Sequence, residues 1–157
     1  MFQKYLLIFL VSMVPLIELR GSIVMAVGME LDYMTALAVS VVGNMLPVPL
    51  IYFFARKVLL WGAHRKYIGK FFRFCLEKGE KAGKRLTATA GRGGLFVALL
   101  LFVGIPLPGT GAWTGTLAAS LLNMGWKSTT GAVSLGVILA GIIMATVSSL
   151  GLHIFGL

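Results

Sequence analysis

Four long apolar segments fill most of this chain, and two of them are interrupted near their middles by proline, glycine and polar residues. The segments cover residues 5–29, 33–55, 94–124 and 128–151. A helix of about 20 residues crosses the ~30 Å hydrocarbon core of a membrane, so the second and fourth segments are long enough to cross it. The first and third fall into pieces of roughly 10 to 13 residues, which as helices reach about 15–20 Å, half of the membrane.

The composition supports a membrane location. Apolar residues make up 58% of the 157 residues and charged residues only 12%, whereas a soluble domain has about 45–50% apolar and about 25% charged residues. This balance excludes a disordered chain and argues against a water-soluble globule. We therefore expect an all-α integral membrane protein that forms a single membrane domain over residues 1–157.

The interruptions at residues 15–21 and 106–111 predict two re-entrant helical hairpins, because proline and glycine end helices. The hairpins would cover residues 5–31 and 94–124. Broken backbone inside a membrane is tolerated where protein or a wet cavity covers it. Each hairpin would be followed by a transmembrane helix, at residues 33–55 and 128–152. The alternative, in which both interrupted segments cross the membrane completely, stays open.

The two halves of the chain share one pattern. Residues 1–55 form repeat one and residues 93–157 form repeat two, and each reads as half-helix, proline-containing break, half-helix, polar turn and spanning helix. The loop charges predict opposite topologies for the two halves, which makes an inverted repeat. Interrupted segments at matching places in two halves are typical of a transport site.

The segment between the repeats, residues 56–92, carries the whole net charge of +9, with eleven Lys and Arg residues against two Glu residues. Positively charged loops lie on the cytoplasmic side of a membrane. Aromatic residues alternate with the cations, which predicts amphipathic helices at the interface whose cations bind anionic lipid head groups. A solvated connector is the alternative. In an apolar chain this basic segment indicates lipid, and no nucleic acid is expected as a partner.

Two charged residues lie deep inside the first apolar segment, Glu18 and Arg20. Charges there are costly and usually mark a transport pathway or a site. Arg20 offers a planar fork of donors that suits carboxylate or phosphate, and Glu18 is the candidate proton carrier because desolvation favours the neutral carboxyl. The two residues are not on one helical face, so we expect them in an extended break. The alternative is an ion pair that only locks the hairpin tips together.

The second break supplies backbone geometry and hydroxyl groups. Gly109 and Gly111 allow a tight turn, and the half-helices that start after Gly21 and near Ala112 are expected to point their positive ends at the membrane midplane. Together with Arg20 they predict an anion site. Further candidate substrate contacts are Thr110, Thr114 and Trp113, although Trp113 is equally consistent with simple packing between helices.

The remaining candidates are structural. Breaks or kinks are expected at Pro15, Asn44, Pro47, Pro49, Pro106 and Pro108. The two histidines have no carboxylate or thiol companions in the sequence, so no metal site is expected. We find no nucleophile–base pattern and no phosphate loop, which argues against an enzyme, and we expect no cofactor.

Three motifs resemble the small multidrug export protein family: residues 18–23 (ELRGSI), 43–49 (GNMLPVP) and 105–115 (IPLPGTGAWTG). That family is similar to the wider DedA (VTT-domain) membrane proteins. The resemblance implies an inverted repeat of re-entrant hairpins, a multi-pass protein of a prokaryotic plasma membrane, and proton-dependent lipid-carrier or phospholipid translocation. Val24 departs from the family pattern, which usually has proline there, so the first break is expected to be less sharp.

Our leading hypothesis is a transporter or flippase for an anionic amphiphile of the phospholipid or polyprenyl-phosphate type, acting as a homodimer. Arg20 and the helix ends would bind the phosphate, and Glu18 would carry a coupling proton. A second hypothesis is an exporter of cationic drugs with Glu18 as the counter-ion. A third is a membrane scaffold that binds partners through residues 56–92.

Overall fold

The protein is an all-helical bundle, as the sequence predicts. The computed structural model describes residues 2–15, 17–107 and 110–155, and helices are the only regular elements in that part of the chain. They are α1 (Phe2–Met13), α2 (Glu18–Gly28), α3 (Tyr33–Met45), α4 (Pro47–Ala63), α5 (Gly69–Gly104), α6 (Ala112–Leu121) and α7 (Trp126–Phe155).

Three helical stretches are long and apolar enough to cross a membrane: Tyr33–Ala63, Thr87–Gly104 and Trp126–Ser148. The first joins α3 and α4, which are separated only at Leu46. Leu46 itself keeps helical dihedral angles of φ −63° and ψ −40°, so Pro47 and Pro49 sit in the first turn of α4, where proline is tolerated. The expected break there is therefore minor, and the helix runs eight residues beyond position 55.

The second candidate span is shorter than its residue count suggests. Gly91 has φ 69° and ψ −179°, so α5 bends sharply there. The part after the bend, residues 92–104, is about 20 Å long at ~1.5 Å per residue. The predicted half-helix from residue 94 is thus the second arm of one longer, bent helix.

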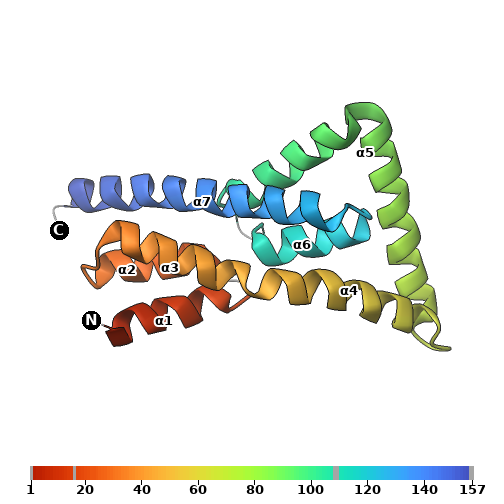
Figure 1. Ribbon diagram of the computed structural model, residues 1–157, viewed down its shortest axis with the longest axis horizontal. Helices are drawn as coiled ribbons and strands as arrows, with labels where there is room; N and C mark the ends of the chain where they lie inside the picture. The colour runs from red at the N-terminus through yellow and green to blue at the C-terminus, as the bar shows by residue number, and fades with distance from the viewer. Residues whose placement is uncertain (1, 16, 108–109, 156–157) are drawn as a thin grey trace.

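The short helices pack at both ends of the long ones. Helices α1 and α2 pack against each other and against α3 at one end of the molecule, while the second arm of α5 packs with α6 and α7 toward the other end (Figure 1). At about 1.5 Å per residue, α1, α2 and α6 are each shorter than a membrane core. These short helices are compatible with re-entrant hairpins, which remain a prediction.

One structural feature corrects the sequence interpretation. The first break was expected to extend through Gly21, but α2 begins at Glu18, so Glu18, Arg20 and Gly21 all lie in its first turn. The break is confined to the few residues between Met13 and Glu18. Leu19 and Ile23 lie four residues apart on one face of α2, and burying both side chains in the core favours helix from Glu18 onward.

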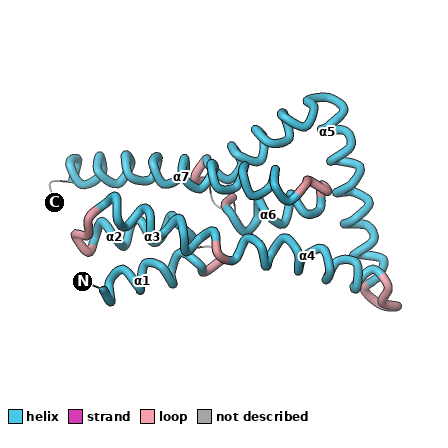
Figure 2. Tube along the Cα trace, viewed as in Figure 1, coloured by secondary structure: helices cyan, strands magenta, loops and turns pink. Residues whose placement is uncertain are grey.

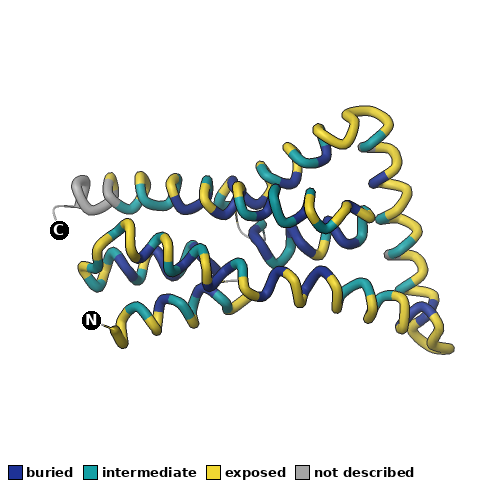
Figure 3. Tube along the Cα trace, viewed as in Figure 1, coloured by how far each residue is buried: buried dark blue, intermediate teal, exposed yellow. Residues whose placement is uncertain are grey.

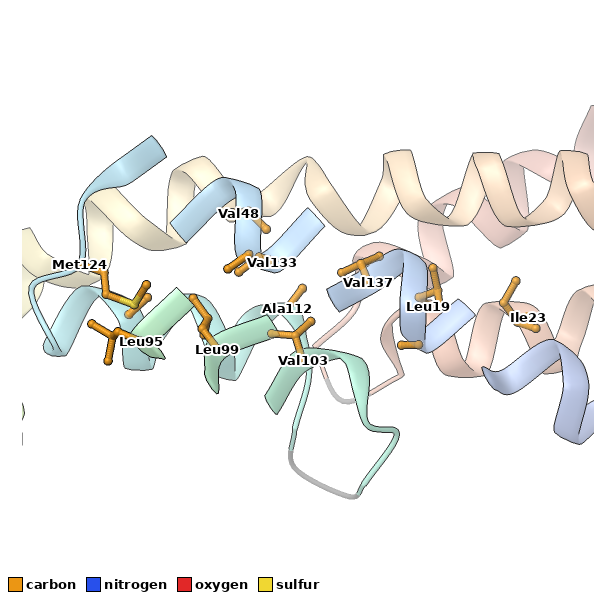
Figure 4. Packing of buried hydrophobic residues seen from close by; sticks show 13 residues of the cluster. Leu19, Ile23, Val48, Leu95, Leu99, Val103, Ala112, Met124, Val133 and Val137 are labelled. Carbon is orange, nitrogen blue, oxygen red and sulfur yellow. The ribbon is translucent and has the colours of Figure 1, made fainter. Parts of the chain in front are cut away.

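The core runs along the molecule and includes residues of α2, α4, α5, α6 and α7 (Figures 3 and 4). It includes Leu19 and Ile23 from α2, Val103 from α5, Ala112 from α6 and Val137 from α7, which are all at most 2% exposed. Small residues let these helices approach closely, as is usual between membrane helices. The outer faces of the long helices carry exposed Leu, Ile, Val and Phe, which suits contact with lipid.

The N-terminus of α3 is fixed by a side-chain cap. Asp32 accepts hydrogen bonds from the Thr35 hydroxyl at 2.6 Å and from the Thr35 backbone N–H at 2.9 Å. These bonds hold the pKa of Asp32 below its usual value. The cap therefore contributes fully above the unfolded pKa of about 4 and is lost as the pH falls through the lower folded value.

Replacing Gly43 with alanine is expected to separate α1 from α3. A Cβ atom at position 43 would lie 2.6 Å from the backbone oxygen of Phe9, so the free energy of unfolding should fall by about 1–3 kcal/mol. Gly28→Ala is the control, because its Cβ meets no atom within 4 Å; it should leave stability unchanged or raise it by up to about 1 kcal/mol. Titration with SDS in mixed micelles measures both, and equal stability of the two variants would contradict this packing.

Candidate functional site

The two chain breaks meet near the middle of the long axis of the molecule. Figure 2 shows the loop between α1 and α2 and the loop between α5 and α6 in this region. Helix α2 starts where the first break ends, and α5 ends and α6 starts on either side of the second break. Helix ends expose unpaired backbone groups, so this junction needs polar partners if it lies away from water.

Glu18 supplies those partners for α6. Its carboxylate accepts hydrogen bonds from the backbone N–H of Ala112 at 3.2 Å and of Trp113 at 3.1 Å. The side chain is only 6% exposed. A negative charge at a helix N-terminus is stabilised by the unpaired N–H groups and by the helix dipole. Glu18 thus caps a helix that lies 94 residues further along the chain.

Gly111 makes this cap possible. It precedes α6 with φ 153°, a conformation that L residues rarely adopt. A Cβ atom there would lie 2.6 Å from the Glu18 carboxyl carbon. Glycine is therefore required both by the backbone and by the approach of the carboxylate.

Arg20 supplies the complementary partners for α5. Its guanidinium donates to the backbone oxygen of Leu107, to that of Ile105 at 3.3 Å, and to the Thr110 hydroxyl at 2.7 Å. These oxygens lie just past the C-terminus of α5, where the helix dipole is negative, and the two carbonyls also accept hydrogen bonds from Leu107 and Thr110 within the second break. One turn of α2 therefore places a charge of the appropriate sign at each end of the second break.

This arrangement carries local backbone strain. Glu18 has φ 49°, in the left-handed region, which costs a non-glycine residue about 1–2 kcal/mol. Such a conformation persists where surrounding contacts enforce it, and these conformations cluster at functional sites. Here the enforcing contacts are the two hydrogen bonds to α6 and the buried neighbour Leu19.

A cavity of about 430 Å³ opens beside this junction. It is lined by Pro15, Glu18, Arg20, Pro106, Leu107, Thr110, Trp113, Thr114, Leu117 and Met144. On the inner side of Glu18 and Arg20 lies a void of about 10 Å³, close to the size of one water molecule. Asn44 and Gly111 line this void, and the Asn44 side-chain oxygen has no hydrogen-bond partner among the described residues.

Most of the predicted site residues come together here. The cavity brings Glu18 and Arg20 beside Thr110, Trp113 and Thr114, with Pro15 and Pro106 at its wall. Gly21 lies in α2 outside the lining, and Pro47 and Pro49 lie in α4, away from it. Pro108 and Gly109 fall outside the described residues.

One part of the predicted anion site is already in use. The N-terminus of α6 was expected to face a substrate, but its first N–H groups bind the Glu18 carboxylate instead. Sequence reasoning also missed Leu117 and Met144. Met144 lies in an uninterrupted apolar stretch of α7, which carries no local sequence signal for a site. The Ile105 and Leu107 carbonyls are a different case, because the predicted end of the helix before Pro106 indicates that backbone acceptors lie there.

Replacing Glu18 with alanine should destabilise the protein, because two N–H groups of α6 would lose their acceptor in a buried position. We expect the free energy of unfolding to fall by about 2 kcal/mol. Glu18→Gln retains one oxygen acceptor and should lose less. Glu77→Ala, at an exposed position of α5, is the control and should have no effect. Unfolding in SDS titrations of the purified variants decides this, and a Glu18→Ala protein as stable as the control would disprove the cap.

Comparison with known proteins agrees with the membrane character of the chain. Residues 18–143 match the sequence model of the family described as "Putative small multi-drug export protein". Curated proteins and solved structures gave no significant match. The matched region begins at Glu18 and contains Arg20, the second break and all of α6, and so covers most of the chain and the charged junction. On this evidence the chain belongs to the family of small multi-drug export proteins.

Proposed function

We propose that this protein is a multi-pass membrane transporter that moves an anionic amphiphile through the cavity between the two hairpin tips. The observation that carries the proposal is the unequal exposure of the two charges that line the cavity. Glu18 is 6% exposed and bound to α6, whereas Arg20 is partly exposed. The charge that the site presents to a substrate is therefore positive.

Arg20 retains binding capacity in this arrangement. A guanidinium has five N–H donors, and its hydrogen bonds to described residues use three of them. Two donors are left for a phosphate or carboxylate. Trp113 lines the same cavity, and its Nε1 atom is buried without a hydrogen-bond partner among the described residues.

The rest of the lining suits the apolar part of the same molecule. Pro15, Pro106, Leu107, Leu117 and Met144 form half of the lining. Charged and hydroxyl groups beside an apolar wall match the head group and the chain of a phospholipid or a polyprenyl phosphate. The similarity to the DedA proteins, which the motifs suggest, points to the same class of substrate.

Coupling to protons would act through Glu18. Protonation of the carboxylate removes the charge that strengthens its two bonds to α6 and ends the favourable interaction with the helix dipole. The α6 end would then separate more easily from α2, opening the junction. In this proposal, α1 with α2 and the second arm of α5 with α6 form re-entrant hairpins of an inverted repeat, with residues 56–92 on the cytoplasmic side of a prokaryotic plasma membrane and a homodimer as the working unit.

Export of cationic drugs is the second candidate, and the family description favours it. Glu18 would then leave α6 to bind the drug, and Arg20 would repel it. The third candidate, a membrane scaffold, would act through the cations of residues 56–92 and would not need the junction.

Transport by reconstituted protein distinguishes these functions. We expect Arg20→Ala to slow translocation of fluorescent phosphatidylglycerol by about tenfold or more, because a charged hydrogen bond contributes about 1.5–3 kcal/mol. Glu18→Gln should abolish the dependence on a pH gradient. Arg73→Ala, an exposed arginine of α5 outside the cavity, is the control and should transport normally.

The other outcomes assign the other functions. Drug efflux that survives Arg20→Ala and is lost in Glu18→Gln would identify a cationic-drug exporter. Full activity in both variants, together with loss of function when the cations of residues 56–92 are neutralised, would identify a scaffold.

A further inference from the structure

A cavity larger than the one at the charged junction lies inside the bend of α5. It has a volume of about 890 Å³. Figure 1 shows the two arms of α5 as two sides of a triangle that the first part of α7 closes, with the turn between α6 and α7 beside the first arm. The bend at Gly91 has φ 69°, which favours glycine.

Close backbone contacts hold this triangle together. A Cβ atom at Gly79 would lie 2.7 Å from the Leu121 backbone oxygen, and one at Gly83 would lie 3.1 Å from the Leu122 carbonyl carbon. Asn123 in the turn accepts a hydrogen bond from Arg56 of α4. The cavity wall is therefore built by the two arms of α5 and by the turn between α6 and α7, which these contacts hold against α5 and α4.

The lining of this cavity is amphipathic. Lys84 and Arg92 place two exposed cations on it, one from each arm of α5, against a single acid, Glu80. Leu95 and Met124 provide a buried apolar floor, at 7% and 5% exposure. Two positive charges above an apolar surface match a phosphodiester with attached acyl chains.

The position of the cavity suits the same ligand. The candidate spans Thr87–Gly104 and Trp126–Ser148 both begin beside it, so it lies at the end of the apolar region. The first arm of α5 runs across this end of the molecule (Figure 1) and carries the exposed aromatics Phe71 and Phe74 among its cations. Aromatic and basic residues together are typical of a helix at the head-group level of a membrane.

We propose that this cavity is a specific binding site for one anionic phospholipid, with the head-group phosphate between Lys84 and Arg92 and an acyl chain along Leu95 and Met124. Basic pockets between membrane helices on the cytoplasmic side bind anionic head groups in this way. The site is separate from the junction at Glu18 and Arg20, and it does not depend on transport. It also differs from general attraction by the basic segment, because it assigns the binding to two of the eleven cations.

Native mass spectrometry of the full-length protein with phosphatidylglycerol tests this assignment. The Lys84→Ala/Arg92→Ala double variant should bind the lipid about thirtyfold more weakly, since each cation contributes about 1 kcal/mol near anionic lipid. The control is Lys78→Ala/Lys81→Ala, which removes the same charge at two positions of α5 that do not line the cavity. It should weaken binding much less, because neither lysine lines the proposed head-group site. Equal losses in the two double variants would show surface attraction only and would overturn the proposal.

A second variant tests the cavity without changing charge. Ala88 is exposed and lines the cavity, so Ala88→Trp should fill it and displace phosphatidylglycerol while leaving thermal unfolding unchanged. Undiminished lipid binding by folded Ala88→Trp protein would overturn the proposal.

Two further measurements identify the occupant. Phosphatidylcholine and inorganic phosphate should not compete with phosphatidylglycerol at equal concentration. Competition by inorganic phosphate would mean a site for free anions and not for lipid. A dimer that Ala88→Trp dissociates, with lipid binding unaffected, would mean that a second copy of the chain occupies the cavity. Either result rejects the lipid assignment.

Discussion

The structure depends on one turn of α2, whose two charged side chains bind backbone groups on both sides of the distant second break. Glu18 binds the N-terminus of α6, and Arg20 binds the carbonyls after the C-terminus of α5. The two residues are two positions apart, and the left-handed backbone of Glu18 sets its direction apart from that of Arg20, so each reaches a different side of the break. The pairing is electrostatic as well as geometric, since each charge faces the helix end of opposite polarity.

This arrangement answers the main difficulty of a broken helix in an apolar chain. Each interrupted helix leaves N–H and C=O groups that cost several kcal/mol where neither protein nor water binds them. Here the chain satisfies them with two charged side chains and with Thr110, which bonds to Arg20 and to the Ile105 oxygen. The same residues border an open cavity, so the groups that stabilise the break are also the groups that a substrate or a proton would meet.

The sequence allowed good prediction of the helices and of where the chain breaks, because apolar segment length and the positions of proline and glycine act locally. It placed the second break at residues 106–111 and singled out Glu18 and Arg20 from their rarity in an apolar segment. It did not predict that α2 begins at Glu18, because helix formation there depends on the burial of Leu19 and Ile23 in the core, where α2 contacts α3 and α7. Likewise, composition divides residues 69–104 into a basic segment and an apolar segment, whereas the structure joins them as the two arms of α5 through the bend at Gly91.

The sequence by itself determined that this chain is an all-helical membrane protein with two interrupted apolar segments and a concentrated positive charge, since these properties follow from composition and short-range pattern. Only the tertiary structure decided which broken end each charge satisfies, that Glu18 faces α6 while Arg20 is left partly open to the cavity, and that α5 folds back to enclose a second, larger cavity. The physical reason is that these contacts join residues more than 80 positions apart or depend on a single glycine bend, and neither leaves a periodic signal in the sequence.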